Sequence, residues 1–359
     1  MPRPLPRPRP RLRRRAAGSA AMITVAALAL TACAGNEPLV DDPFSDIINS
    51  ASGNRPLPPG AYYEAADSRA PEEGDRSVAT SSYAPGTGTA EDRIPEIVDR
   101  GRIIVGVDPS LNLMSFRNAT GELSGFEIDL SREISRDIFG DPDRVDFRYI
   151  NSGERSEAIE SGTVDVVIRT MTTTPSRNEV VDFSTPYLTS STGLLSTTTS
   201  GIESAEDLGG RTVCVSGNTT SEEVAREIAS DSMLLIVQNW GDCLTSIQQH
   251  QADAVITDTV ILAGYAAQDS SLQIVNQQLT SENFAAAVEK GNTGLVRQIN
   301  STLERMRGDG SWNSIFDTWL GPYLPAKAQP PSDFITETES DADSGSGTNS
   351  GDSADQEDS

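Results

Sequence analysis

Residues 170–187 read TMTTTPSRNEVVDFSTPY, and they follow a short apolar run at 164–168. An apolar run of this length that ends in a polar loop predicts a buried parallel strand. Hydroxyl side chains, Pro175 and Arg177 come where that strand ends. Hydroxyls and backbone N–H groups at a helix start donate hydrogen bonds, and a guanidinium adds a bidentate pair. The stretch therefore predicts a site that grips a carboxylate.

On both sides of this stretch, short apolar runs alternate with amphipathic segments, which is typical of an α/β fold. The first group of expected elements comprises strands at 103–107, 145–150 and 164–168, a helix opening at Phe126 and a helix at 154–161. The pattern then restarts with strands at 212–215, 234–237 and 254–256, a helix at 221–229 and a helix through Leu244 and Ile247. A strand-like run at 283–289 and helices at 293–306 and 312–320 complete the pattern. Two successive βαβαβ units predict two similarly built lobes.

The N-terminal 32 residues have the parts of a secretory signal. Seven arginines and no acid precede an apolar run at 20–30, and Leu30-Thr31-Ala32-Cys33 follows. The run is too short to span a bilayer, and small residues precede the cysteine as in a bacterial lipobox. We therefore predict a signal peptide at 1–32, a lipid on Cys33 and attachment to the outer face of the cell membrane. The alternative is an uncleaved anchor with an incidental cysteine.

The charge balance argues against a nucleic-acid partner. The formal net charge is −25, and removal of the arginine-rich leader makes it more negative. Such a surface repels phosphate backbones. Residues 33–92 are rich in Pro, Gly, Ser and acids and predict a disordered tether, and residues 326–359, with one lysine and nine acids, predict a disordered tail.

Two cysteines remain after Cys33, namely Cys214 and Cys243. Leftover thiols in an oxidising compartment usually pair, so a structural disulfide is expected between them. Two unpaired buried thiols are the alternative.

Five separated motifs resemble those of family 3 extracellular solute-binding proteins, the amino-acid receptors of ABC importers. They appear in the family's order at 101–108, 121–130, 164–187, 217–220 and 252–258, with Glu127 in place of the usual aspartate. The resemblance covers roughly 93–324 and implies a two-lobed periplasmic-binding-protein fold of type II. It places lobe 1 at 93–190 and 288–325 and lobe 2 at 191–287, joined by two crossings near 186–192 and 285–289. A cleft with a double hinge can close on a ligand.

The resemblance also implies a clamp for an α-amino acid. Arg177, with the hydroxyl and N–H groups of Thr172 and of Thr219 or Thr220, would bind the carboxylate, and Asp258 would bind the ammonium. Thr170, at the same strand end, is a further candidate. Each charge needs a partner because closure of the cleft removes its water. The alternatives are a surface salt bridge for Arg177 and a helix N-cap for Asp258.

Selectivity for the ligand side chain rests on Arg169, three residues before Thr172. A second cation facing the cleft would favour an acidic ligand, but Arg169 could instead pair with an acid of its own lobe. Arg117 is another candidate for ligand contact. The sequence segments at 239–243 and 261–265 resemble those of actinobacterial glutamate/glutamine-binding lipoproteins. The resemblance therefore implies that the ligand is glutamate, aspartate or one of their amides.

No enzyme is expected. His250 is the one histidine, and no metal-ligand spacing or nucleophile motif is present, so neither a metal nor a cofactor is predicted. The expected partners are a free amino acid, the permease and ATPase subunits of an ABC importer, and the membrane through the lipid, with a monomeric binding protein. The alternatives are an amino-acid sensor that signals to a membrane partner and a periplasmic dehydratase on the same scaffold.

Overall fold

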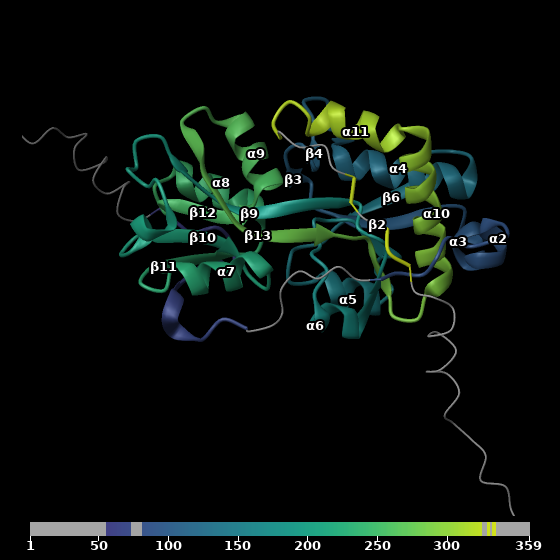
Figure 1. The fold of residues 1–359 in the computed structure, drawn as a ribbon, viewed down its shortest axis with the longest axis horizontal. Helices are drawn as coiled ribbons and strands as arrows, with labels where there is room; N and C mark the ends of the chain where they lie inside the picture. Colours follow the sequence, from purple (N-terminus) through teal and green to yellow (C-terminus); the bar gives the residue numbers. More distant parts are fainter. Residues whose placement is uncertain (1–54, 73–80, 325–328, 331, 335–359) are drawn as a thin grey trace, which may run out of the picture. The chain divides into compact units, whose positions relative to one another are not determined.

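A computed structural model of the protein describes residues 55–72, 81–324, 329–330 and 332–334, all within the compact unit 55–359 (Figure 1). The predicted signal peptide, Cys33 and most of the predicted tail lie outside the described residues. Among the residues that are described, no helix has the length and apolar character needed to cross a membrane.

Lobe 1 is built on a five-stranded sheet with the order β6-β2-β7-β14-β8. Its strands are β2 (Ile103–Val107), β6 (Val145–Tyr149), β7 (Val166–Val167), β8 (Val181–Phe183) and β14 (Ala287–Glu289). Strand β2 pairs in parallel with β6 and β7, and β14 is antiparallel to β7 and β8. Two helices make the crossovers, α4 (Phe126–Phe139) and α5 (Arg155–Glu160). The site loop thus begins at the carboxyl end of β7, as the apolar run predicted.

Lobe 2 is built on a six-stranded sheet with the order β1-β11-β10-β12-β9-β13. Its strands are β1 (Tyr62–Ala65), β9 (Leu188–Thr197), β10 (Thr212–Ser216), β11 (Met233–Val237), β12 (Ala254–Asp258) and β13 (Leu272–Phe284). Helices α7 (Thr220–Ile228), α8 (Trp240–Gln248) and α9 (Thr259–Gln268) follow β10, β11 and β12. Strand β10 pairs in parallel with β11 and β12. The second βαβαβ unit of the sequence is this lobe.

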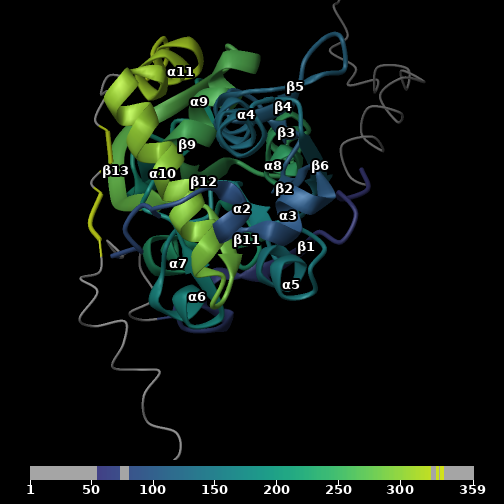
Figure 2. The ribbon, with the colours of Figure 1, turned by 90° about the vertical axis from the view of Figure 1, so that its right-hand side faces the viewer.

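The remaining elements are short or cover lobe 1. A small sheet contains β3 (Ser110–Leu111), β4 (Ser115–Arg117) and β5 (Leu123–Ser124), and the other helices are η1 (Ala66–Ser68), α2 (Ala90–Arg93), α3 (Pro95–Arg100), α6 (Pro175–Val180), η2 (Ala205–Leu208), α10 (Thr293–Asp309) and α11 (Ser311–Trp319). Helices α10 and α11 pack against α4 (Figure 2). The buried Trp312 donates its indole N–H to the Tyr187 carbonyl at 2.8 Å, so the end of the fold returns to lobe 1.

Two chain crossings connect the lobes. Strands β9 and β13 pair antiparallel and run between the two groups of strands in Figure 1. The chain passes from β8 into β9 through residues 184–187, and it returns from β13 into β14 through 285–286. The predicted crossings overlap these segments. All of β9 belongs to the sheet of lobe 2, so that lobe begins a few residues earlier than the sequence indicated.

The predicted tether requires correction, because part of it is folded. Strand β1 pairs antiparallel with β11 at the edge of lobe 2. The fully buried side chain of Arg226 donates to Glu64 Oε2 at 2.7 Å and to the Ala66 carbonyl at 3.2 Å, which fastens this segment to α7. Ser82, further along the same segment, forms a bridge with Phe334 of the predicted tail. These contacts need partners far away in the chain, so the composition of the segment could not reveal them.

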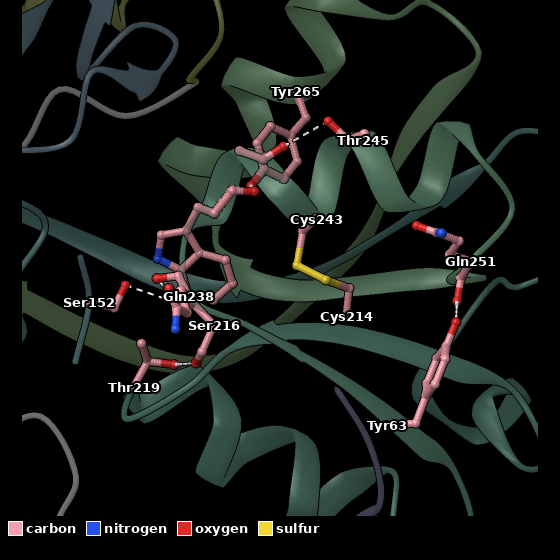
Figure 3. Close-up of a disulfide and its surroundings, with 12 residues drawn as sticks. Tyr63, Ser152, Cys214, Ser216, Thr219, Gln238, Cys243, Thr245, Gln251 and Tyr265 are labelled. Carbon is pink, nitrogen blue, oxygen red and sulfur yellow. Dashed lines mark hydrogen bonds between the residues drawn. A yellow bond between two sulfur atoms is a disulfide. The ribbon is translucent and has the colours of Figure 1, made fainter. Parts of the chain in front are cut away.

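The predicted disulfide is confirmed. Cys214 on β10 and Cys243 on α8 are bonded, with their Cα atoms 5.6 Å apart (Figure 3). Both residues are fully buried in the core of lobe 2. The bond ties the central strand to the helix that covers it, which is a structural role.

Candidate functional site

The structure brings together clamp residues from both lobes. Thr172 Oγ1 of lobe 1 lies 3.5 Å from Thr220 Oγ1 of lobe 2. Arg177 Nη1 donates to the Thr172 carbonyl at 2.9 Å, and its Nη2 donates to the Asn218 carbonyl of lobe 2 at 3.3 Å. Arg177 therefore spans the junction between the lobes.

Two helix starts face this junction. Thr174 caps α6 and accepts a hydrogen bond from the Arg177 amide, and Thr219 caps α7 and accepts one from the Glu222 amide. Thr220 is the first residue of α7, which is nine residues long. Amide groups in the first turn of a helix point outward and favour an anion. This geometry suits the carboxylate of an amino acid.

Asp258 is the last residue of β12, and one of its two carboxylate oxygens makes no hydrogen bond to the described residues. Its side chain makes no capping hydrogen bond to α9, so the N-cap alternative does not describe its side chain. Asp258 is 4% exposed, and its Oδ1 has no hydrogen-bond partner among the described residues. Burial, and then the charge of Glu282, raise the pKa of Asp258 well above its usual range, while Arg155 and Arg177 oppose that rise. A cation that binds here would relieve this cost.

Glu282 lies among the candidate site residues, although no sequence motif pointed to it. It lies on β13, is 1% exposed, and accepts hydrogen bonds from Thr280 at 2.8 Å, Thr192 at 3.3 Å and Thr220 at 3.4 Å. One weak signal was present, namely an acid in the middle of an otherwise strand-like segment. Its closeness to Asp258 depends on the pairing of β12, β9 and β13, which no local pattern encodes.

Arg155 is the second residue that was missed. It opens α5 and is 5% exposed. Its Nε donates to the Ser152 carbonyl at 2.8 Å, and among the described residues no acceptor binds its two terminal nitrogens. Burial lowers the pKa of Arg155, and the charges of Arg177 and Arg169 lower it further, whereas Asp258 raises it. A buried guanidinium with unused donors is suited to a ligand oxygen.

Arg169 takes the alternative role that the sequence left open. Its guanidinium is fully buried and pairs with Asp108 Oδ2 at 2.7 Å. It also donates to Ser152 Oγ at 2.9 Å, and Ser216 Oγ of lobe 2 donates to that same oxygen at 2.8 Å. Figure 3 shows Ser152 beside Ser216. The charge of Arg169 is thus matched within its own lobe, which corrects the expectation that it faces the ligand as a second cation.

Arg117 lies apart from this group. It is exposed on β4 and donates to the Gly121 carbonyl at 2.8 Å. The expectation of a ligand contact is therefore corrected, because the side chain closes a turn within the small sheet.

Thr170 has a backbone conformation that is unusual for a β-branched residue, with φ of 40°. Its amide donates to Glu127 Oε1 at 2.6 Å, and the Tyr187 hydroxyl donates to the same oxygen at 2.6 Å. Glu127 is completely buried, and burial raises its pKa to about 7. Glu127 therefore fixes the loop at Thr170 through these two hydrogen bonds. This gives a structural reason for an acid in the motif at 121–130.

Replacement of Glu127 with glutamine is expected to change how stability depends on pH. The folded pKa of about 7 exceeds the ordinary 4.5, so the folded state binds this proton more tightly than the unfolded state. The free energy of unfolding then falls as pH rises through that window, by on the order of 3 kcal/mol. Urea denaturation at several pH values should show this fall in the wild type and its loss in Glu127→Gln, with exposed Glu160→Gln as the control. Parallel curves for the wild type and Glu127→Gln would contradict the assignment.

The lobes are in direct contact beyond the clamp. Asn112 Nδ2 of lobe 1 donates to the Gly264 carbonyl of lobe 2 at 3.2 Å. A Cβ atom at Gly264 would lie 2.5 Å from the Asn112 carbonyl oxygen, and one at Gly241 would lie 2.8 Å from Ser110 Oγ. Glycine at these two positions lets the lobes approach closely. The two lobes are therefore in contact across the cleft in this structure.

A cavity of about 170 Å³ lies beside the clamp residues. Its lining includes Arg177, Thr219 and Thr220, and also Arg69, Glu72 and Glu223. Among the described residues, no cluster of His, Cys, Asp and Glu side chains could hold a metal ion. His250 is exposed just beyond the end of α8. The arrangement can bind a zwitterion through opposite charges and hydroxyl groups.

Several known proteins are similar to this chain in sequence. The ABC transporter glutamine-binding protein GlnH of Bacillus subtilis (strain 168) is 33% identical over 233 residues, which cover 64% of this chain and 85% of that protein. The glutamate-binding protein GluB of Corynebacterium efficiens is 28% identical over 251 residues, which cover 66% of this chain and 85% of that protein.

Solved structures agree on the fold. The ancestral amino acid-binding protein AncCDT-1, described as a precursor of cyclohexadienyl dehydratase, has a TM-score of 0.58 and is 30% identical, and the match covers 63% of this chain and 98% of that one. The chain has the two-lobed type II fold of periplasmic amino-acid-binding proteins. The model of the bacterial extracellular solute-binding proteins, family 3, matches residues 103–322, which is more than half of the chain, and the protein therefore belongs to that family.

Proposed function

We propose that this protein is the lipid-anchored, extracytoplasmic binding subunit of an ABC amino-acid importer, and that it takes glutamate, aspartate or their amides. Cys33, the proposed lipid site, lies outside the described residues. The bound, closed form would dock on a separate permease, which an ATPase subunit would drive.

The observation that carries the proposal is the complementary charge across the closed cleft. Lobe 1 contributes the guanidinium groups of Arg155 and Arg177, and lobe 2 contributes the buried carboxylate of Asp258, whose Oδ1 has no partner among the described residues. Burial makes unpaired charges costly, so a ligand with both a carboxylate and an ammonium stabilises the closed form. An α-amino acid carries these two groups on one carbon.

Arg155 supports the choice of an acidic side chain or its amide. If Arg177 binds the α-carboxylate, the terminal nitrogens of Arg155 can donate hydrogen bonds to an oxygen of the ligand side chain. Glutamate and aspartate offer a carboxylate there, and glutamine and asparagine offer a carbonyl. The printed names of two relatives, a glutamine-binding and a glutamate-binding protein, agree with this range.

Replacement of Arg155 with methionine should change the preference between glutamate and glutamine. The variant loses a charge-to-charge contact with glutamate but only a charge-to-dipole contact with glutamine. We expect glutamate affinity to fall roughly 100-fold and glutamine affinity roughly 10-fold. Isothermal titration calorimetry measures both affinities, and exposed Arg148→Met is the matched control. An unchanged glutamate-to-glutamine ratio would remove Arg155 from the ligand site.

The whole proposal is tested by titrating the full-length secreted chain, with Cys33→Ser to prevent lipidation, with the twenty common amino acids. Tight binding of acidic amino acids or their amides supports it, and no binding of any amino acid would show that it is wrong. The structural relative described as a dehydratase precursor makes one enzymatic control worthwhile. Product formation from a prephenate-like substrate would favour an enzyme over a receptor.

A further inference from the structure

Glu282 is an unusual carboxylate for a protein interior. It is 1% exposed, and its three hydrogen-bond donors are all threonine hydroxyls, from Thr192, Thr220 and Thr280. Among the described residues no lysine, arginine or histidine forms an ion pair with it. Buried carboxylates are nearly always paired with a cation, so Glu282, which has none among the described residues, is suited to a cation that a ligand brings.

A second buried carboxylate lies beside the first. The pairing of β12 with β9 sets Asp258 opposite Thr192, and the Thr192 hydroxyl donates to Glu282. Asp258 and Glu282 therefore flank the same threonine. The charge of Glu282 is, after burial, the largest cause that raises the pKa of Asp258. Two close carboxylates in a dry site resist ionising together.

The charged groups around Asp258 come from separate elements. The pKa of Asp258 is raised by the charge of Glu282 on β13 and lowered by those of Arg155 on α5 and Arg177 on α6. The two cations belong to lobe 1, and the two carboxylates belong to the strands of lobe 2. With both cations directed to ligand oxygens, the carboxylates are left to one positive group of the ligand.

We propose that Glu282 is a second carboxylate of the ammonium site, and that its charge keeps a proton on Asp258 until the ammonium of the ligand takes the place of that proton. This rests on the proposed function. No covalent bond to carbon changes: the ammonium enters with its three hydrogens, and the proton of Asp258 passes to the solvent buffer. The Asp258 and Glu282 side chains then face one ammonium, and the threonine hydroxyls remain bonded to Glu282.

The pair restricts the ligand to molecules with an unmodified ammonium group. Glutarate and N-acetylglutamate keep the acidic groups but bring no cation to the two carboxylates. They leave the proton of Asp258 in place and gain no contact there. Binding is also linked to pH with a definite sign: affinity falls as pH is lowered, because protons then compete with the ammonium for Asp258.

The test is calorimetry of the full-length chain with its tightest-binding amino acid, from about pH 5 to about pH 8, in two buffers of different protonation enthalpy. We expect the wild type to release protons on binding and to reject glutarate. Glu282→Gln should bind roughly 10- to 100-fold more weakly and release no proton, because Asp258 then ionises alone beside two arginines. Glu289→Gln, at an exposed carboxylate on the neighbouring strand, is the matched control and should match the wild type.

Each other outcome overturns the inference. Wild-type binding without proton release, a measurement that needs no variant to fold, would show that the ammonium displaces no proton from Asp258. A Glu282→Gln variant that binds weakly but still releases the proton would show that Glu282 only supports the threonines. Wild-type affinity in Glu282→Gln would exclude it from the site. If the wild type binds no amino acid at all, the proposed function is wrong as well, so the two failures are distinguishable.

Discussion

Arg177→Ala is expected to lower amino-acid affinity by roughly a thousand-fold. The variant removes the cation assigned to the ligand carboxylate, and it also removes the bridge from the Thr172 carbonyl of lobe 1 to the Asn218 carbonyl of lobe 2. The ligand then enters a closing cleft with its carboxylate unpaired. Calorimetry with glutamate and glutamine measures the loss.

Arg177→Lys separates charge from geometry in the same experiment. Lysine keeps the charge but cannot make the planar, two-pronged contact, so its affinity should fall between those of the wild type and Arg177→Ala. Because Arg177 is half-buried, neither variant should change the thermal midpoint greatly. Unchanged affinity in Arg177→Ala would mean that the clamp has been misplaced.

Asp108→Ala is expected to reduce the free energy of unfolding by about 3–5 kcal/mol. Its partner, the fully buried Arg169, would keep its charge with only Ser152 as an acceptor, and Arg169 Nε already has no partner among the described residues. Asp108 also accepts hydrogen bonds from the Ser110 amide and hydroxyl, which would be lost. Urea denaturation followed by circular dichroism measures the change.

A double variant tests the cause of this loss. Asp108→Leu combined with Arg169→Met removes both charges, so it should cost less than the two single changes together. Asp146→Ala, in an exposed pair with Arg148, should change stability by less than about 1 kcal/mol. An equally small effect of Asp108→Ala would show that the buried pair is not a structural requirement.

The order of helices and strands could be predicted closely from the sequence. The apolar run at 103–107 is strand β2, and the spacing that begins at Phe126 is helix α4. Both signals are local, because a buried strand needs consecutive apolar residues and an amphipathic helix needs them on one face. Strand β1 could not be predicted in this way, because its stabilising partners, β11 and Arg226, are more than a hundred residues away in the chain.

In the candidate site, too, the residues with local sequence signals could be predicted, and those that depend on distant contacts could not. Thr172, Arg177, Thr220 and Asp258 could be proposed from motifs, because each stands at a strand end or helix start that the sequence itself marks. The prediction that Arg169 selects the ligand side chain was wrong, because Arg169 pairs with Asp108. No local sequence pattern near position 169 indicates this partner. Arg155 and Glu282 were missed for the complementary reason: each carries an ordinary charge that becomes unusual only when distant elements bury it.

The stretch at 170–187 by itself predicts a loop that follows a buried strand and is suited to a carboxylate, and a segment that leads into the second lobe. Tertiary structure alone decided which charges remain available to a ligand. Burial and pairing set that availability: Arg169 is matched by Asp108, whereas Arg155 and Asp258 are buried with unused hydrogen-bonding capacity. A residue type specifies a charge, but the cost and the partner of that charge depend on which other elements exclude water from it.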